Sequence, residues 1–510
     1  MRQAHRFLVL AAVGSILTGC GVTIHEPKLH VPAETPRHEK GSPAIKAHMK
    51  SGEVYVLHTW SLSPEQTLRG EGREYGIDRV ERSHGSFSLP LDSIALVETD
   101  STRNVYPAGL QVMAVLTTFW GSLATYCSLD PKACFGSCPT FYAEGGSSDR
   151  PVAEGFSDSI AKVLEARDLD ALFDVRPTSR SFTLLMRNEA LETHAVRRVR
   201  LLAARRPAGG RVLADGNGRL YPATSIRPPL SCLAPEGNCS EMVRARDSLE
   251  RSSLADPEDL AARETVELEF PPAEGPSGLV LGARQTLVST FVLYQTMAWM
   301  GRSAGDWLAA MERGGRETTE RAMGTIRLLG GIDVAVEEAG GWRTIGSYRE
   351  AGPIAGDVQV IPFTPPPGRL RVRLTMAKGS WRLDVVALAQ LLAPMSPRVV
   401  ALDRVEHEGR VDASALARLS GTGPRLITTP GDEYRLVFRL PEPVSEQELF
   451  LESEGYYYEW MRGEWLAEED PAMLAMAMLR PDETLRRLAG PFKEREGRME
   501  QVFWASRYRR

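Results

Sequence analysis

One short pattern in the chain matches the nucleophile motif of serine hydrolases. Residues 301–305, Gly-Arg-Ser-Ala-Gly, fit Gly-x-Ser-x-Gly, in which a strand-to-helix turn exposes the serine to an acid and a histidine later in the chain. His407 is the only histidine after Ser303, so a catalytic triad would have to use it. A helix-like run precedes Ser303, however, and Asp306 follows three residues later. This spacing favours a serine that caps a helix, and a hydrolase built on Ser303 and His407 is our third functional hypothesis.

The first twenty residues resemble a bacterial lipoprotein signal. Arg2 and Arg6 precede an apolar run over 7–17, and Leu-Thr-Gly-Cys then ends at Cys20. The apolar run is about a dozen residues long, which is too short to span a bilayer comfortably. The resemblance implies cleavage before Cys20 and lipidation of that cysteine. Gly21 stands where an Asp would mark inner-membrane retention in such proteins, so the resemblance implies the outer membrane, facing the periplasm or the cell surface.

The remaining five cysteines predict disulfides, because an oxidising periplasm favours them. They are Cys127, Cys134, Cys138, Cys232 and Cys239. The last two flank a turn-like segment and are expected to pair with each other. Two of the first three are also expected to pair, which leaves one thiol, and the sequence does not decide which. Three thiolates with no histidine nearby fall short of the four ligands of structural zinc, so no metal and no cofactor is predicted.

Two stretches could bind a ligand. The first is aromatic and contains Tyr456, Tyr458 and Trp460, whose rings suit sugar stacking or a protein interface. The second is basic and contains Arg369, Arg371 and Arg373, which alternate with apolar residues and would form a ridge on one strand face, suited to an anionic glycan or phosphate. Each also has a plainer explanation. The aromatic stretch reads as a strand that enters the core, and the ridge reads as a solvated face.

Length and composition set the class of protein. A chain of 510 residues predicts two to four domains, and 43% hydrophobic residues is ordinary for a globular protein. The net charge of −5 argues against a nucleic-acid-binding protein, which would carry a basic surface.

The predicted fold is α+β and rich in β-structure. It has a small N-terminal β barrel-like unit, a central β-sandwich with a helical insertion, and C-terminal strands followed by helices. The expected parts are a signal peptide (1–19), a flexible tether (20–50), the small β unit (51–103), an apolar helix with a cysteine loop (104–142), a β-rich region (143–264), a helix with the β-sandwich (265–395) and a C-terminal α+β module (396–510).

Hydrophobic periodicity and turn residues place the individual elements. Helices are expected at 157–173, 285–301, 303–313 and 317–329. Strands are expected at 332–338, 342–348, 358–363, 370–376 and 381–391, then at 425–428, 433–438 and 449–458. Three C-terminal helices, at 471–479, 482–488 and 494–507, are expected to pack on these strands. The charge-free run 104–129 is interpreted as a buried or interface helix, with insertion into a membrane as the alternative.

Three stretches together resemble uncharacterised bacterial envelope lipoproteins that carry a Ser-Cys-Pro motif. They are Cys-Phe-Gly-Ser-Cys-Pro-Thr-Phe-Tyr at 134–142, Asn-Glu-Ala-Leu-Glu-Thr-His at 188–194 and Gly-Tyr-Tyr-Tyr-Glu-Trp at 455–460. This resemblance implies an envelope location and no assigned activity. The strand alternation over 332–391 is also similar to galactose-binding-like β-sandwiches, a fold that does not fix function.

The sequence therefore predicts a lipid-anchored envelope lipoprotein that is most simply a non-enzymatic binding or assembly protein. The expected partners are the membrane, through the lipid at Cys20, and a protein of the outer membrane. A glycan-binding protein is the second hypothesis.

Overall fold

The computed structural model describes residues 22–508, apart from 31, 36–43, 78–79, 106–131, 134, 137, 145–149 and 350–351. The described chain forms two compact units. The smaller holds the strands up to Val105, and the larger holds nearly everything from Lys132 onward. Both are built mainly from strands, with most helices between residues 288 and 329 and after residue 470, so the predicted β-rich α+β fold is confirmed.

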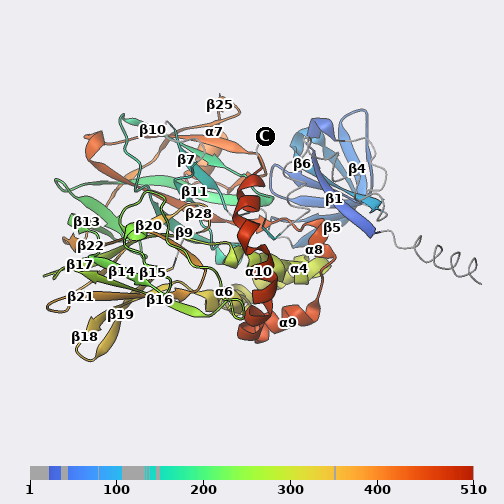
Figure 1. The fold of residues 1–510 in the computed structure, drawn as a ribbon. Helices are drawn as coiled ribbons and strands as arrows, with labels where there is room; N and C mark the ends of the chain where they lie inside the picture. Colours follow the sequence, from blue (N-terminus) through green and yellow to red (C-terminus); the bar gives the residue numbers. More distant parts are fainter. Residues whose placement is uncertain are drawn as a thin grey trace, which may run out of the picture. The chain divides into compact units, whose positions relative to one another are not determined.

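The smaller unit is one antiparallel sheet of six strands (Figure 1). In chain order the strands are β1 (Val22–His30), β2 (Ile45–Met49), β3 (Val54–Leu62), β4 (Thr67–Tyr75), β5 (Glu81–Pro90) and β6 (Ile94–Val105). Their order in the sheet is β1-β6-β2-β3-β4-β5. The expected flexible tether over 20–50 is wrong for β1 and β2, because both strands pair with β6. The expected closure into a small barrel does not occur among these described strands, because β1 and β5 end the pairing path and β5 is exposed along most of its length.

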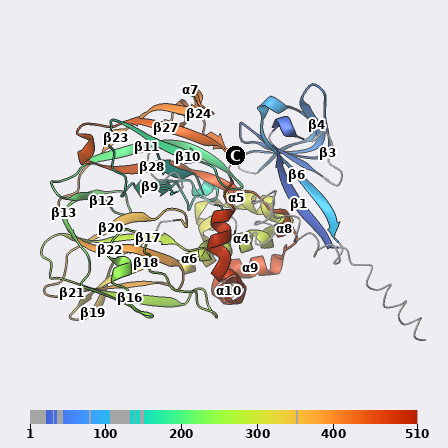
Figure 2. The same cartoon turned by 45° about the horizontal axis from the view of Figure 1, so that its top comes forward.

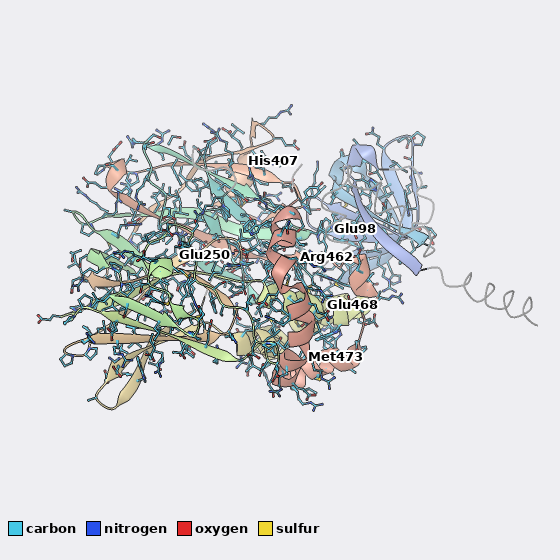
Figure 3. The ribbon with its side chains drawn as sticks, in the orientation of Figure 1. Glu98, Glu250, His407, Arg462, Glu468 and Met473 are labelled. Carbon is cyan, nitrogen blue, oxygen red and sulfur yellow. A yellow bond between two sulfur atoms is a disulfide. The ribbon has the colours of Figure 1, made fainter. Side chains whose placement is uncertain are left out.

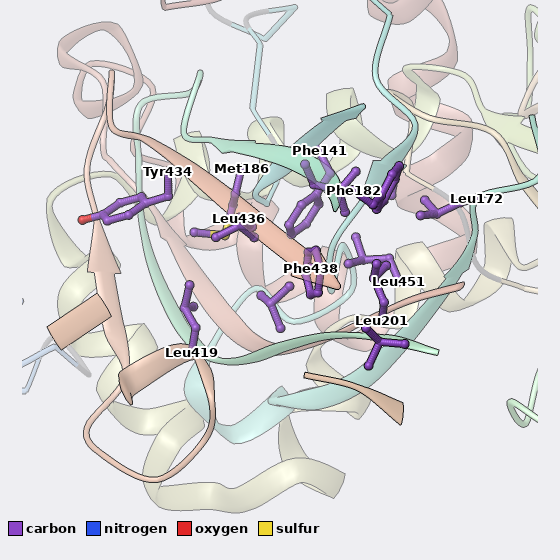
Figure 4. Packing of buried hydrophobic residues seen from close by; sticks show 14 of the residues in the cluster. Phe141, Leu172, Phe182, Met186, Leu201, Leu419, Tyr434, Leu436, Phe438 and Leu451 are labelled. Atoms are coloured by element: carbon purple, nitrogen blue, oxygen red, sulfur yellow. The ribbon is translucent and has the colours of Figure 1, made fainter. Parts of the chain in front are cut away.

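Two sheets of the larger unit pack face to face around one hydrophobic core (Figure 4). The first has the order β25 (Arg410–Val411), β24 (Leu402–His407), β27 (Glu433–Arg439), β10 (Ser181–Arg187), β7 (Thr140–Ala143), β8 (Ala153–Glu154). The second has the order β23 (Arg398–Val400), β11 (Glu192–Arg205), β28 (Gln447–Glu459), β9 (Ala166–Ala171), with β26 (Leu426–Thr428) also paired to β11. Strands from 140–205 and from 398–459 thus share both sheets, so the expected parts 143–264 and 396–510 are not separate folding units.

A closed barrel and a further sheet form the rest of the β-structure. The barrel runs β12 (Arg211–Ala214), β13 (Leu220–Arg227), β22 (Trp381–Leu391), β17 (Ser277–Gln285), β20 (Asp357–Phe363). The sheet runs β15 (Gly237–Asn238), β14 (Ser231–Ala234), β16 (Arg263–Phe270), β21 (Leu370–Ala377), β18 (Ile332–Glu338), β19 (Gly341–Tyr348). The five strands predicted between 332 and 391 all occur, but they divide between the barrel (β20 and β22) and the sheet (β18, β19 and β21). A single hydrophobic cluster draws on both layers.

The helices of the larger unit gather against one end of these stacked sheets (Figures 1 and 2). They include α4 (Val288–Met300), α5 (Ala304–Ala322), α6 (Gly324–Leu329), α9 (Pro471–Leu479) and α10 (Pro481–Ala505), and α7 (Ala413–Leu419) lies separately against β11 and β24. The expected break near 314–316 falls at Gly315, whose φ of 78° interrupts α5.

Three predictions about the helices are wrong. The expected helix over 157–173 is a single 3-10 turn at Lys162–Leu164 followed by strand β9, because β9 pairs with β28 and this tertiary pairing overrides local helical periodicity. The two expected helices over 482–507 are the one helix α10, which continues through Pro491. Helices α9 and α10 share a core with α4 and α6 instead of packing mainly on strands.

The cysteines and the apolar run are only partly described. Cys232 and Cys239 form the predicted disulfide, with Cα atoms 5.0 Å apart. Cys20, Cys127 and Cys134 lie outside the described residues, as do residues 106–129 of the charge-free run. None of the helices in the described part of the chain is long and apolar enough to cross a membrane.

Candidate binding cavity

A cavity of about 410 Å³ opens in the larger unit between its β-layer and its helices. One wall is the turn at 156–160 together with the start of β9 and the end of β28. The opposite wall comes from α4, α5 and α6. The volume falls within the usual range for small-molecule sites.

The turn at 156–160 is held rigidly by buried groups. The N–H of Phe156 donates to Asp168 Oδ2 over 2.6 Å. Phe156 has a φ of 44°, which is uncommon for a residue with a side chain. The N–H of Ser159 donates back to the carbonyl of Phe156, which closes the turn. Tyr457 then fixes both sides: its hydroxyl donates to the Ser157 carbonyl over 3.0 Å, and its N–H donates to the Ser159 carbonyl over 3.0 Å. Strain held by so many partners is typical of functional sites.

Asp158 stands at the tip of this turn and lines the cavity. Its carboxylate has neither a hydrogen bond nor an ion pair among the described residues. The Asp158 side chain is exposed to solvent, and partial desolvation by the surrounding protein raises the pKa of its carboxyl group above the usual range. An unpaired carboxylate with a raised pKa in a cleft marks a candidate binding site.

The inner end of the cavity is aromatic and acidic. The Tyr294 hydroxyl, from α4, donates to Glu459 Oε1 over 2.7 Å at the end of β28. Gly136 lies directly against this pair, since a Cβ placed on Gly136 would come within 1.6 Å of the Tyr294 hydroxyl oxygen. The rings of Phe156, Tyr294 and Tyr457 are almost fully buried and contribute to the lining.

The outer wall carries arginines from the helices. Arg316 pairs with Glu320 over 3.5 Å and donates to the Glu165 carbonyl over 3.0 Å. Arg327 is exposed on α6, and its side chain makes neither a hydrogen bond nor an ion pair within the described part of the chain. The cavity therefore runs from an acidic, aromatic interior to a basic, solvated rim.

The structure does not bring the hydrolase candidates together. Ser303 is the residue before α5, in the helical layer. His407, labelled in Figure 3, ends β24 in the first sheet. The His407 ring stacks on Tyr434 with ring centroids 4.3 Å apart, and its Nδ1 lies 3.0 Å from the Glu433 carbonyl. Ser303 occupies the predicted N-cap position of α5. The predicted capping hydrogen bond is wrong, because the Ser303 side chain makes none. These contacts leave the hydrolase hypothesis without a catalytic arrangement.

The aromatic stretch lies in the core. Tyr456, Tyr458 and Trp460 are 0%, 1% and 6% exposed, so their rings present no surface for sugar stacking. The Tyr458 hydroxyl donates to Glu312 over 3.0 Å, and the Trp460 indole N–H donates to Thr193 over 3.0 Å. The interpretation as a strand entering the core accounts for these residues.

The arginine ridge lies on the outer face of β21 and is compensated by carboxylates. Arg371 pairs with Glu337 and Glu267, and Arg373 pairs with Glu267 and covers the Trp342 ring at 4.0 Å. Arg369 lies 3.5 Å from Glu269. A ridge whose charges are already paired offers an anionic glycan little net attraction.

The three stretches that carry the lipoprotein resemblance meet beside the cavity. The Tyr142 hydroxyl donates to Glu189 over 2.5 Å, which joins the first stretch to the second. Glu192 and His194 on β11 stand opposite Glu459 and Tyr457 on β28, which joins the second to the third. Of the three stretches, the first and the third line the cavity, through Gly136, Tyr457 and Glu459.

The buried histidine and cysteine of these stretches have structural partners. Burial lowers the pKa of His194 to about 3, so its ring is neutral at physiological pH, and its Nε2 lies 3.0 Å from Glu192. The Cys138 thiol is buried, with Sγ 3.4 Å from Glu154 Oε1. Across the described residues, no three His, Cys, Asp or Glu side chains gather closely enough to hold a metal ion.

Asp158 is missed by sequence reasoning because the helix predicted over 157–173 makes it one more polar residue on a helix face. Tyr294 is missed for a similar reason, since a tyrosine in a predicted core helix is most simply explained by hydrophobic packing. The turn that carries Asp158 and the helix α4 that carries Tyr294 are brought to one cavity only by tertiary packing.

No family model and no curated protein matches this chain. Among solved structures, one similar chain belongs to the "Structure of infectious bursal disease virus Gx strain", with 9% sequence identity over 93% of this chain and 91% of that chain. The TM-score of 0.11 is too low for that likeness to carry an argument about fold or function.

Replacing Asp158 with asparagine is expected to stabilise the protein at neutral pH. A carboxyl whose pKa is raised in the folded state ionises at a cost to folding, and this cost grows as the pH rises through the ordinary carboxyl range. We expect Asp158→Asn to gain about 0.5 kcal/mol at pH 7, a small value because water in the cavity screens the charge. The gain should vanish below about pH 3, where the carboxyl is protonated in both states.

Urea unfolding of the two proteins between pH 3 and pH 8 measures this difference. Asp306→Asn is the matched control, because Asp306 is an exposed aspartate outside the cavity and its loss should bring no gain. A variant at Asp158 that is less stable than the wild type at pH 7 would contradict the expectation.

Proposed function

We propose that this protein is a non-enzymatic binding protein of the bacterial envelope, held at the outer membrane by lipid on Cys20. The observation that carries the binding role is the unpaired Asp158 carboxylate, presented by a rigid turn into a cavity of about 410 Å³. A site used for binding alone needs a fixed polar anchor and an apolar wall, and the cavity has both. Ser303 and His407 supply no competing catalytic arrangement.

The anchor is supported by the sequence signal that ends at Cys20. Two or three acyl chains hold a protein stably on a membrane, whereas one chain gives only marginal binding. A protein partner in contact with residues 104–126 stays a prediction, because nearly all of that run lies outside the described residues.

The anchor is tested by two single substitutions in the full chain, expressed in a bacterium with an outer membrane. The wild type is expected to incorporate labelled palmitate and to fractionate with the outer membrane. Cys20→Ser should abolish labelling, since the acylated thiol is lost. Gly21→Asp should keep the label but move the protein to the inner membrane. A wild type that is unlabelled and soluble would overturn the proposed anchor.

The binding role is tested separately by thermal unfolding of the purified wild type with small envelope constituents, namely muropeptides, glycerophosphodiesters, amino sugars and polyamines. At least one should raise the unfolding temperature, because a ligand that binds only the native state stabilises it. Ser289→Phe, which fills the cavity from α4, should remove that shift. If no compound shifts the wild type, the binding role fails.

A further inference from the structure

We propose that the second half of α5, residues 316–323, is a lid that opens to admit a ligand to the cavity. This inference rests on the proposed binding function and adds how access to that site is controlled.

The lid segment lies between two breaks in the helical layer. Gly315 has φ 78° and ψ 176°, so the α5 helix is interrupted there, and a Cβ built on Gly315 would meet no atom within 4 Å. A second break follows at Met323, whose ψ of 32° separates α5 from α6. Glycine adopts either sign of φ at little cost, and the open space around Gly315 leaves room for its backbone to turn, so the segment has a hinge at this end.

The segment forms a wall of the cavity that is one helix thick. Arg316, Glu320 and Met323 are spaced four and three residues apart, which places them on one helix face, and all three line the cavity. Glu317 and Arg321 belong to the opposite face and are exposed to solvent. An outward movement of this segment would therefore widen the entrance to the cavity.

The two halves of α5 are held very differently. Among the eight residues 316–323 only Thr319 is buried, and its hydroxyl donates to the Gly315 carbonyl over 3.1 Å, within α5 itself. In the first half, Glu312 Oε1 accepts the Tyr458 hydroxyl over 3.0 Å and the Val163 N–H over 3.1 Å, which fixes this half to the β-layer. Segments with few buried contacts open at a lower free energy than the structure around them.

One contact latches the lid to the opposite wall. The Arg316 guanidinium donates to the Glu165 carbonyl over 3.0 Å. Glu165 follows Leu164, which lines the cavity, and its carboxylate pairs with Arg197 and Arg425. Glu165 therefore stays with the β-layer when the lid moves, and the bond to Arg316 must break for the lid to open.

Hydrogen–deuterium exchange of the purified wild type, read by mass spectrometry of its peptides, tests the opening without any ligand. The amides of 320–323 and of 308–311 occupy the same positions, fifth to eighth, in the two halves of α5. We expect the first group to exchange about tenfold faster or more, because it belongs to the half that opens. Equal exchange of the two groups would overturn the inference.

Thiol labelling measures access to the cavity itself. Ser289 lines the cavity from α4, so Ser289→Cys is labelled with N-ethylmaleimide, and the wild type gives the background from its own cysteines. Adding Arg316→Met removes the latch and should speed labelling about three- to fivefold. Arg321→Met is the matched control, because Arg321 pairs with Glu317 as Arg316 pairs with Glu320 but lies on the outer face, and it should leave the rate unchanged. Equal labelling rates in these two variants would overturn the inference.

The inference and the proposed function can fail separately. If an envelope constituent stabilises the wild type but neither test shows opening, the lid falls and the binding function stands. If both tests show opening but no envelope constituent binds, the binding function falls and the lid stands as a motion of the fold.

Discussion

Replacing Arg251 with methionine is expected to cost about 3–5 kcal/mol of folding free energy, the largest effect of any single ion-pair substitution that we predict. Arg251 is 0% exposed, and its guanidinium makes two hydrogen bonds to Glu264, of 2.8 and 2.7 Å. It also makes two to Glu236, of 2.7 and 2.9 Å. Paired, planar hydrogen bonding of this kind suits arginine and no other side chain.

The cost comes from the carboxylate that the substitution would leave behind. Burial alone would lower the pKa of Arg251, but Glu264 and Glu236 raise it above its ordinary value, so the guanidinium stays charged. Glu264 is almost completely buried, and beyond Arg251 it accepts a hydrogen bond from Ser253. Without Arg251, its charge would sit in the core with no counter-ion.

Denaturant unfolding measures the loss, and two further variants show its origin. Arg371→Met removes an arginine from exposed ion pairs and should cost less than about 1 kcal/mol. Adding Glu264→Gln to Arg251→Met should restore part of the stability, because the stranded charge is then gone. Two results would contradict this explanation. One is that Arg251→Met unfolds at the same denaturant concentration as Arg371→Met. The other is that adding Glu264→Gln to Arg251→Met restores no stability.

The strands over 332–391 and the disulfide could be predicted because their signals are local. Leu370, Val372, Leu374 and Met376 alternate with polar residues, and all four point into the core between the two layers. The Cys232–Cys239 disulfide joins two cysteines that are only seven residues apart in sequence. The alternation of apolar and polar residues predicts the strand, and the short separation in sequence predicts the disulfide.

The cavity could not be predicted because its parts are joined only by tertiary pairing. The apolar residues after Phe156 have helical spacing. No residue pattern within this segment indicates that part of it pairs with β28 as strand β9. The motif at 134–142 was visible, but the role of Gly136 depends on a helix more than 150 residues later. Arg251 is similar: its segment is polar, and its burial depends on where β16 lies.

Gly136→Ala is expected to destabilise the protein by about 3 kcal/mol, and the reason is space. The new Cβ would lie 1.6 Å from the Tyr294 hydroxyl oxygen and 2.6 Å from Glu459 Oε1, closer than a Cβ atom approaches a non-bonded oxygen. The Tyr294 ring cannot retreat easily, because it is buried against Trp465 with ring centroids 4.9 Å apart. Overpacking of this kind costs about 1–3 kcal/mol, and loss of the Tyr294–Glu459 hydrogen bond adds about 1–3 kcal/mol more.

Two comparisons separate this clash from a general effect of alanine. Gly490→Ala adds the same methyl group at a glycine of α10 with no atom within 4 Å of the new Cβ, and it should stabilise the helix by about 0.5–1 kcal/mol. Tyr294→Phe removes the hydroxyl, so Gly136→Ala should cost less in that background than in the wild type. Thermal unfolding of the four variants measures both differences. If Gly136→Ala lowers the stability equally in the wild type and in Tyr294→Phe, then the clash with the Tyr294 hydroxyl is not the reason for a glycine at position 136.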